Sequence, residues 1–286
     1  MLVDGKSLVN GKSGNLISIR NRGLLYGDGV FRTFVASHGK AQHWPLHYRK
    51  LQHDCAALDI ACPDEARLTD ELDGLLVQHH DAVVKLIVTR GEGARGYAPP
   101  PDAKTAHIWD VSPLPDYPAE WATRGIRARL CQLRLGHQPR LAGIKHLNRL
   151  ENVLAAAEWS GDAQSPDSSL RASRIAEGLL LDIAGNVIGG TRSNLFLVAK
   201  GQLITPDLSR CGVAGVQRER VIAWAAQRQM PLQMRNIGLD EVLRADELFV
   251  VNSVFGLWPI SELEQRRFAG FPIASQIRKN LFEQEV

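Results

Sequence analysis

The sequence predicts a protein of mixed α and β structure folded as two domains. Its length of 286 residues exceeds the usual size of a single domain. Segments with helical periodicity, such as residues 46–60, alternate with apolar runs typical of buried strands, such as residues 82–89. A proline-rich stretch at residues 112–118 is the best candidate for a linker. We therefore expect a small N-terminal domain of residues 1–115 and a larger C-terminal domain of residues 116–286.

Composition restricts the possible partners. The hydrophobic fraction of 44% and the charged fraction of 23% are those of a soluble globular protein. The net charge of +3 is small, and no run of five like charges occurs, so nucleic acid and membrane are not expected as partners. A small-molecule substrate is expected instead.

Cysteine and histidine usage indicates a reducing compartment and no metal. The four cysteines show no C-x-x-C spacing and no secretory signal precedes them, so we expect free thiols and a cytoplasmic location. Neither H-E-x-x-H nor a zinc-type pattern of cysteine and histidine is found, so no metal site is expected.

The first domain is expected to start with short antiparallel strands, because Asp-Gly and Asn-Gly pairs occur at residues 4–5 and 10–11. Residues 23–29 place three glycines beside Tyr26, which suggests a loop that approaches a ligand closely; a tight turn before the strand at residues 30–35 explains them equally well. Helices are expected over residues 46–60, ended by Pro63, and from Leu68 to Leu76.

A long Gly-rich loop follows the buried strand at residues 82–89. It carries Arg90 and Arg95 and runs into three prolines. Loops of this length are usually functional or disordered. Because the guanidinium fork suits carboxylates, substrate anchoring and a plain solvated loop stand as alternatives.

The second domain is expected to contain a strand at residues 126–133 and two hairpins, at residues 176–188 and 194–205. Residues 212–218 then open a helix, and glycines at a helix N-terminus suit a phosphate, although a simple loop-to-helix junction gives the same pattern. A strand at residues 249–251 ends in Asn252 and Ser253, which offer backbone donors and a hydroxyl.

Lys145 is the candidate nucleophile. It lies where a Gly-containing approach turns into a segment whose apolar residues have the spacing of one helix face: Leu147, Leu150, Val153, Leu154 and Ala157. An amine flanked by Ile144 and Leu147 could be partly desolvated, which favours the neutral nucleophile needed for Schiff-base chemistry. The alternative is an ordinary surface lysine near a helix start.

Taken in order, these motifs resemble those of the fold-type IV pyridoxal-phosphate (PLP) enzymes, over nearly the whole chain. That family includes D-amino-acid and branched-chain aminotransferases and 4-amino-4-deoxychorismate lyase, and residues 89–97 and 141–151 are similar to the lyase branch. The resemblance implies two α/β domains of the α+β type, similar to D-amino-acid aminotransferase, with PLP in the interdomain cleft and the lysine in the C-terminal domain. It also implies a homodimer.

The resemblance also implies roles for individual residues. Lys145 matches the lysine that bonds to the cofactor and carries a proton, and Thr33 matches a threonine that protonates the departing enolpyruvate. The implied cofactor-binding residues are Lys50 or Arg49, Asn194, Val216, Gln217 and Ser253. Arg95, Tyr97 and Tyr26 lie where the substrate is expected to bind.

Two positions depart from the family pattern. The phosphate-binding arginine of the His-x-x-Arg motif that starts at His47 is Lys50, which keeps the charge but loses the fork. The carboxylate that pairs with the pyridine nitrogen is replaced by Gly189, and Arg192, if it pointed inward, would disfavour ring protonation. Restoring the acid as Gly189→Glu should then raise cofactor affinity, provided that the space beside Gly189 is open.

The expected function is 4-amino-4-deoxychorismate lyase activity, which releases pyruvate and 4-aminobenzoate in folate synthesis. Two alternatives stand beside it. One is a PLP-deficient or non-catalytic descendant, suggested by Gly189 and Lys50 together. The other is an aminotransferase acting on D-amino or branched-chain amino acids.

Overall fold

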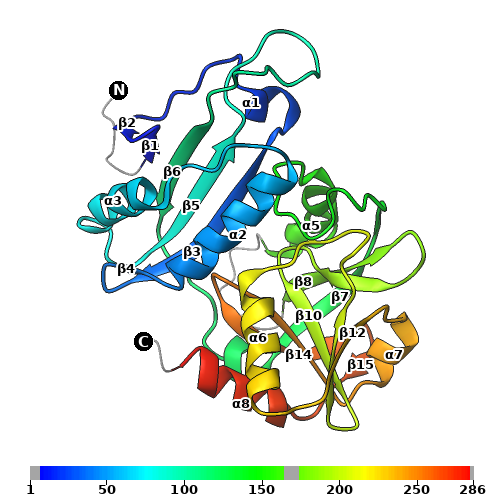
Figure 1. The fold of residues 1–286 in the computed structure, drawn as a ribbon. Coiled ribbons are helices and arrows are strands. Elements are labelled where there is room, and N and C mark those ends of the chain that lie inside the picture. The colour runs from blue at the N-terminus through cyan, green and yellow to red at the C-terminus, as the bar shows by residue number, and fades with distance from the viewer. Residues whose placement is uncertain (1–6, 164–173, 284–286) are drawn as a thin grey trace. The chain divides into compact units, whose positions relative to one another are not determined.

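The computed structural model describes residues 7–163 and 174–283 and confirms the mixed α and β fold (Figure 1). Contacts within the chain divide it into two compact units. The first comprises Met1–Pro115 together with Ile144–Asn148, and the second comprises Asp116–Gly143 and Arg149–Val286. Lys145 therefore packs with the first unit, whereas the sequence analysis placed it in the C-terminal domain.

The first unit is built on an antiparallel sheet of six strands in the order β2-β1-β6-β5-β3-β4. The strands are β1 (Ser7–Val9), β2 (Lys12–Ser13), β3 (Gly29–Ser37), β4 (Lys40–Ala41), β5 (Ala82–Thr89) and β6 (Ala106–Ser112). Alternate residues of β3 and β5 are buried, so one face of the sheet packs on a core and the other is more open.

Helices α2 (Trp44–Ala57) and α3 (Glu65–Leu76) supply the apolar side chains that cover the buried face. A short helix, α1 (Arg22–Tyr26), occupies part of the glycine-rich segment that we expected to be a loop; Asn21 caps it and Gly27, with φ 65°, ends it. Helix α2 ends three residues before the expected position, because Asp59 has φ 54°. Pro63 is therefore not its terminator.

The second unit contains a sheet of nine strands, with the path β12-β11-β10-β13-β14-β7-β8-β9 and β15 paired to β14. Its strands are β7 (Ile126–Leu135), β8 (Ile175–Asp182), β9 (Val187–Gly190), β10 (Asn194–Ala199), β11 (Gln202–Pro206), β12 (Leu232–Arg235), β13 (Glu247–Asn252), β14 (Gly256–Leu263) and β15 (Arg266–Arg267). The pairs β7–β8, β7–β14 and β11–β12 are parallel. The expected hairpins are present as β8–β9 and β10–β11.

Both faces of this sheet are covered. The helices are α4 (Trp121–Arg124), α5 (Leu150–Ala163), α6 (Val216–Gln227), α7 (Leu239–Arg244) and α8 (Pro272–Leu281). Along β10, Leu195 and Leu197 enter one core while Phe196 enters another, where it stacks on Phe249 with ring centroids 5.2 Å apart. No helix among the described residues is long and apolar enough to cross a membrane.

The helix after Lys145 differs from expectation. It starts at Leu150, five residues beyond the lysine, and its apolar residues Leu150 and Val153 are 69% and 60% exposed. Among residues 150–159 of this helix, whose burial the structure describes, Ala155 and Trp159 are buried, and they pack on β7 and β8. The predicted apolar face is therefore wrong.

Candidate active site

The backbone around Lys145 is fixed to strand β3. The Phe31 N–H donates to the Lys145 carbonyl at 2.9 Å, and the Leu147 N–H donates to the Gly29 carbonyl at 2.9 Å. Ile144 is buried in the core of the first unit. Lys145 is thus held in an extended segment along a strand, not at the start of a helix.

The side chain of Lys145 lies on the aromatic ring of Phe31. Its Nζ atom is 4.4 Å from the ring centroid, and Nζ of Lys85 is 5.3 Å from the same centroid. Thr33 follows Phe31 by two residues on β3, and it pairs directly with Lys85 on β5. Because residues two apart on a strand share a face, Lys145, Thr33 and Lys85 gather around Phe31 on the more open face of the sheet.

Beneath this face, Asp54 joins several groups. Its side chain is completely buried and pairs with Arg32, with Nζ of Lys50 at 2.9 Å, and with the backbone N–H of Lys145 at 3.0 Å. Burial alone would raise the pKa of Asp54, but the two cations and these hydrogen bonds outweigh it and hold the pKa below its usual value. Sequence reasoning missed Asp54, although its position four residues after Lys50 on a helix was a local signal that could have found it; Arg32 and Lys145 are distant in sequence.

The arrangement on α2 distinguishes the two candidate phosphate ligands. Arg49 is exposed, whereas Lys50 is buried and directed toward Asp54. Lys50 Nζ also lies 3.3 Å from Nδ1 of His53. Of the two cations, Lys50 is therefore the one that belongs to the same buried cluster as the Lys145 backbone.

In the second unit, Asn194 fixes the loop that leads into α6. Its Nδ2 donates to the Val213 carbonyl at 2.7 Å, and its Oδ1 accepts from the Gly215 N–H at 3.1 Å. A Cβ atom at Gly215 would lie 2.5 Å from Asn194 Oδ1, so only glycine allows this approach. Val216 and Gln217 form the first turn of α6, where backbone N–H groups have no partner within the helix and attract anions.

Ser253 lies in the turn between β13 and β14. The preceding residue, Asn252, organises this turn, since its Oδ1 accepts from the N–H groups of Val254 and Phe255 at 2.9 Å each. Ser253 is half-buried there, at a fixed backbone position.

The loop that lacks the expected acid is held by Glu177 of β8. This buried carboxylate accepts from the Thr191 hydroxyl at 2.6 Å, the Thr191 N–H at 3.0 Å, the Ser193 hydroxyl at 2.7 Å and the Gly178 N–H at 2.9 Å. Gly190 pairs with Leu179 and so shares the face of Glu177, whereas Gly189 pairs with Leu180 on the opposite face. Glu177 therefore orders the loop but does not replace the missing acid at position 189.

Arg192 is also held within the second unit. Its guanidinium carbon lies 5.8 Å from the ring centroids of Tyr117 and Trp159 and 5.9 Å from that of Trp258, and its Nη2 donates to the Ala176 carbonyl at 2.9 Å. Cation–π attraction to these three rings, together with the hydrogen bond to Ala176, holds the side chain in this position.

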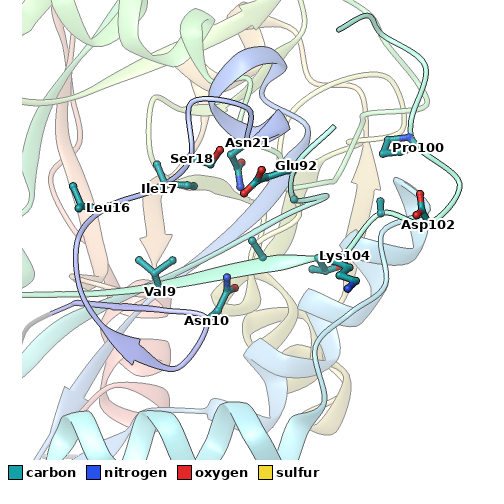
Figure 2. A pocket seen from close by; sticks show the side chains of 14 residues that line it. Val9, Asn10, Leu16, Ile17, Ser18, Asn21, Glu92, Pro100, Asp102 and Lys104 are labelled. Atoms are coloured by element: carbon teal, nitrogen blue, oxygen red, sulfur yellow. The ribbon is translucent and has the colours of Figure 1, made fainter. Parts of the chain in front are cut away.

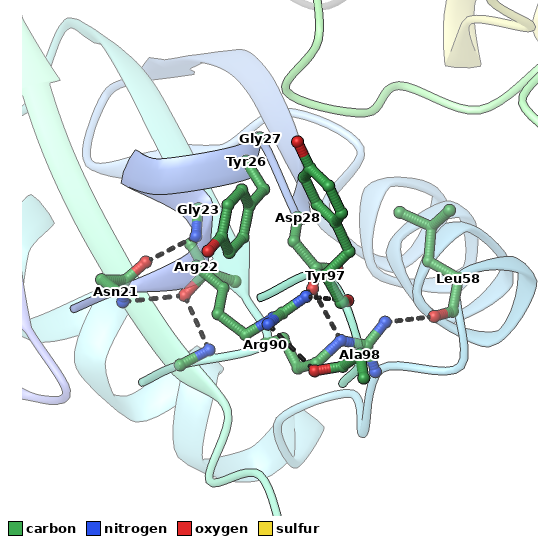
Figure 3. Close-up of polar contacts among 12 residues, drawn as sticks. Asn21, Arg22, Gly23, Tyr26, Gly27, Asp28, Leu58, Arg90, Tyr97 and Ala98 are labelled. Atoms are coloured by element: carbon green, nitrogen blue, oxygen red, sulfur yellow. Dashed lines mark hydrogen bonds and ion pairs between the residues drawn. The ribbon is translucent and has the colours of Figure 1, made fainter. Parts of the chain in front are cut away.

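Two of the three residues expected at the substrate, Tyr26 and Tyr97, lie near Arg22, as Figure 3 shows. Arg22 donates to the carbonyls of Gly96, Tyr97 and Ala98, and it pairs with Asp28 at 2.8 Å. The rings of Tyr26 and Tyr97 are 5.4 Å apart. Arg95 and Tyr97 are exposed, so the structure brings Tyr26 and Tyr97 together and leaves the Arg95 side chain at the surface.

A pocket of about 550 Å³ lies elsewhere in the first unit, as Figure 2 shows. Its polar lining includes Asn10, Asn21, Glu92 and Lys104. None of the residues that the sequence analysis assigned to the site lines this pocket.

The geometry changes the expectation for Gly189→Glu. A Cβ atom at position 189 would lie 2.9 Å from the backbone oxygen of Ser193, which also accepts the Gly190 N–H at 2.9 Å. We expect Gly189→Ala and Gly189→Glu each to lower the free energy of unfolding by about 1–3 kcal/mol, as overpacking does. Urea denaturation would measure this effect.

Gly74→Ala in α3 is the matched control, because nothing lies within 4 Å of the added methyl group and alanine favours helix. If Gly189→Ala is as stable as the parent, the loop yields easily. The steric objection to Gly189→Glu would then fall, and a PLP titration of that variant would test whether the acid raises the affinity.

Replacing Asp54 tests the buried cluster. Asp54→Asn would remove the carboxylate that pairs with Arg32 and Lys50. We therefore expect it to lower the free energy of unfolding by about 3–5 kcal/mol at neutral pH. Because the folded-state pKa is lowered, this stabilisation is present above the unfolded pKa of about 3.9 and disappears as the pH falls through the folded value. Urea denaturation at a series of pH values from 7 downwards would measure the difference in the free energy of unfolding between the parent and the variant. We expect this difference to shrink as the pH falls.

Asp70→Asn, at an exposed position of α3, is the control for removing one carboxylate. The electrostatic explanation would be contradicted if the difference in the free energy of unfolding between the parent and Asp54→Asn stayed constant down to the lowest pH.

Comparison with known proteins agrees with the resemblance seen in the sequence. The chain is 32% identical over 273 residues to aminodeoxychorismate lyase of Vibrio harveyi, covering 95% of this chain and 96% of the relative. It is 25% identical to D-alanine aminotransferase of Bacillus licheniformis, covering 91% of this chain and 88% of that relative. The crystal structure of 4-amino-4-deoxychorismate lyase from Pseudomonas aeruginosa superposes with a TM-score of 0.88 at 42% identity, covering 96% of this chain and 99% of that one. The family model for amino-transferase class IV matches residues 29–263, and the chain therefore belongs to the amino-transferase class IV family.

Proposed function

We propose that this protein is a PLP-dependent lyase that converts 4-amino-4-deoxychorismate to 4-aminobenzoate and pyruvate. The observation that carries the proposal is the meeting of Lys145 and Thr33 on one face of the first unit, around Phe31. Similarity to two lyases over nearly the full chain supports it.

Each of the two residues has a task in this reaction. The Lys145 amine, with the apolar Phe31 ring on one side, takes the proton from the ring carbon that bears the substrate's amino group, and the electron pair of that C–H bond forms the new ring double bond to the neighbouring carbon that carries the enolpyruvyl oxygen. The bond between the ring carbon and the enolpyruvyl oxygen then breaks, and its electron pair leaves with that oxygen. The Thr33 hydroxyl protonates the methylene carbon of the leaving group, which gives pyruvate.

The residues present fit PLP. When bound, PLP would supply a carbonyl group for the substrate amine and a conjugated ring that accepts electrons. The N-terminus of α6, with Val216 and Gln217, would hold the phosphate, and the fixed approach of Gly215 to Asn194 keeps those N–H groups in place. Ser253, in the same unit, is a further candidate for that role.

The loop around Gly189 favours a lyase over an aminotransferase. Transamination depends strongly on a protonated pyridine nitrogen, and no acid occurs from Val187 to Asn194. Loss of enolpyruvate from aminodeoxychorismate produces an aromatic ring, and this driving force compensates in part for a weaker electron acceptor. The reaction that forms an aromatic product is therefore the one best matched to a glycine at position 189.

A coupled assay tests the proposal. A synthase that makes aminodeoxychorismate would be mixed with the purified protein and PLP, and 4-aminobenzoate would be measured by chromatography. We expect Lys145→Ala to lower the rate by at least about 10²–10⁴-fold, the contribution of a positioned acid–base group alone. Lys40→Ala, an exposed lysine of β4, is the control and should leave the rate unchanged.

The assay also separates the alternatives. An active Lys145→Ala variant would refute the mechanism. A parent that makes no 4-aminobenzoate but forms pyruvate from D-alanine and 2-oxoglutarate would be an aminotransferase. A parent that shows no visible PLP absorbance and neither activity would be a non-catalytic descendant.

Lys85 is our candidate for binding a substrate carboxylate. It was missed by sequence reasoning, yet it shares the Phe31 face with Lys145 and forms no ion pair with any described residue, although Asp110 lies opposite on β6. We expect Lys85→Gln to raise KM about 10–100-fold with little change in kcat, because a charge-assisted hydrogen bond is worth roughly 1.5–3 kcal/mol. Lys85→Arg should retain most of the affinity.

Product analogues give a second readout for Lys85. The parent should be inhibited better by 4-aminobenzoate than by 4-aminobenzamide, which lacks the charge, and Lys85→Gln should lose this preference. An unchanged preference in Lys85→Gln would show that another residue, such as Arg95, meets the carboxylate.

A further inference from the structure

Three side chains of different chemistry converge in the second unit: His137, Asp182 and Cys211. One donor atom from each lies within 4.8 Å of the others, and His137 Nε2 is 2.9 Å from Asp182 Oδ2. Asp182 and Cys211 are buried, while the His137 side chain is 21% exposed. An imidazole, a carboxylate and a thiol therefore meet at one partly accessible point.

The backbone holds the three donors in place. Asp182 ends strand β8, and His137 lies just beyond the end of its parallel neighbour β7. The Ile183 N–H donates to the Leu135 carbonyl at 3.1 Å, and the Gln138 N–H donates to the Arg210 carbonyl at 2.8 Å. One hydrogen bond thus ties the backbone near His137 to that of Asp182, and the other ties it to that of Cys211, so the cluster does not depend on flexible side chains alone.

Asp182 is oriented as metal-binding carboxylates usually are. Its Oδ1 accepts the N–H groups of Ala184 at 3.0 Å and Asn186 at 2.8 Å. This leaves Oδ2 directed to His137, with the Asn186 side chain at 3.1 Å as its other partner. Hydrogen bonds from surrounding groups that fix a ligand in this manner are a regular feature of metal sites.

We propose that His137, Asp182 and Cys211 bind a Zn²⁺ ion. Nitrogen, sulfur and carboxylate oxygen are the donors that zinc takes, whereas Mg²⁺ and Ca²⁺ require oxygen ligands. The ion would displace the proton shared by His137 and Asp182 and the proton of the Cys211 thiol, and both protons would pass to solvent. It would take water as a further ligand on the exposed side of His137. Three protein ligands plus water is the usual four-coordinate arrangement of an open zinc site.

Such an ion would stiffen the loop before α6. Cys211 is followed by Gly212, whose carbonyl accepts the Gly143 N–H at 3.0 Å, and Gly143 in turn accepts the Ala214 N–H at 3.1 Å. Fixing Cys211 therefore restrains the segment that leads to Gly215. The inference concerns a site separate from Lys145 and does not rest on the proposed lyase activity.

Metal titration of the purified protein, as isolated with its cofactor and freed of metal by dialysis, tests the proposal. We expect one Zn²⁺ per chain in competition with a chromophoric chelator. Co²⁺ in place of Zn²⁺ should give a thiolate-to-cobalt charge-transfer band in the near ultraviolet. Cys211→Ser should abolish this band, and Cys211→Ser and His137→Gln should each weaken binding by at least about 100-fold.

Cys131→Ser is the matched control, because Cys131 is another buried cysteine of the same unit and lies outside the cluster. It should keep both the stoichiometry and the cobalt band. The proposal is overturned if the parent binds no stoichiometric zinc, if its cobalt complex lacks the charge-transfer band, or if Cys211→Ser and Cys131→Ser bind zinc equally. Should Cys211→Ser fail to fold, the cobalt spectrum of the parent decides.

Discussion

The buried carboxylate of Asp54 is the interaction on which the lysine segment depends. A charge that is completely removed from water is tolerated only with close partners, and Asp54 has Arg32, Lys50 and the Lys145 N–H. Two of these partners come from β3 and α2, and the third comes from a distant part of the chain. This carboxylate, together with the backbone hydrogen bonds to β3, fixes where the lysine backbone lies, and Phe31 contacts its amine.

In the loop from Gly189 to Asn194, too, the polar side chains have close partners. Glu177 accepts hydrogen bonds from the hydroxyls of Thr191 and Ser193. Three aromatic rings lie around the Arg192 guanidinium, and the Asn194 side-chain amide both donates and accepts a hydrogen bond. The loop therefore has a defined structure without the acid that the family pattern places there. Its turn is tight enough that a side chain at position 189 would meet the Ser193 backbone.

Much of the fold was predictable, because it follows from local periodicity. The buried strand at Ala82–Thr89, the two hairpins of the second unit and the helix start at Val216 all appear near their expected positions. The helix face after Lys145 was not predictable: Leu150 and Val153 have the spacing of a core face, yet they are exposed, and periodicity alone cannot say what covers an apolar stripe. Lys85 and Glu177 act through partners distant in sequence, which no local pattern reveals, and of the partners of Asp54 only Lys50, four residues away, could have been expected from the sequence.

The two departures from the family pattern bear on whether the site is in use. A site that has decayed would be expected to leave buried polar groups unsatisfied, at a cost of about 1–3 kcal/mol each. Instead, Lys50 is paired with Asp54, and the space beside Gly189 is closed by a hydrogen-bonded turn between Gly190 and Ser193. Both substitutions are thus accommodated by specific contacts of neighbouring residues. The fold has therefore adapted to a lysine and a glycine at these positions, as the proposed lyase requires.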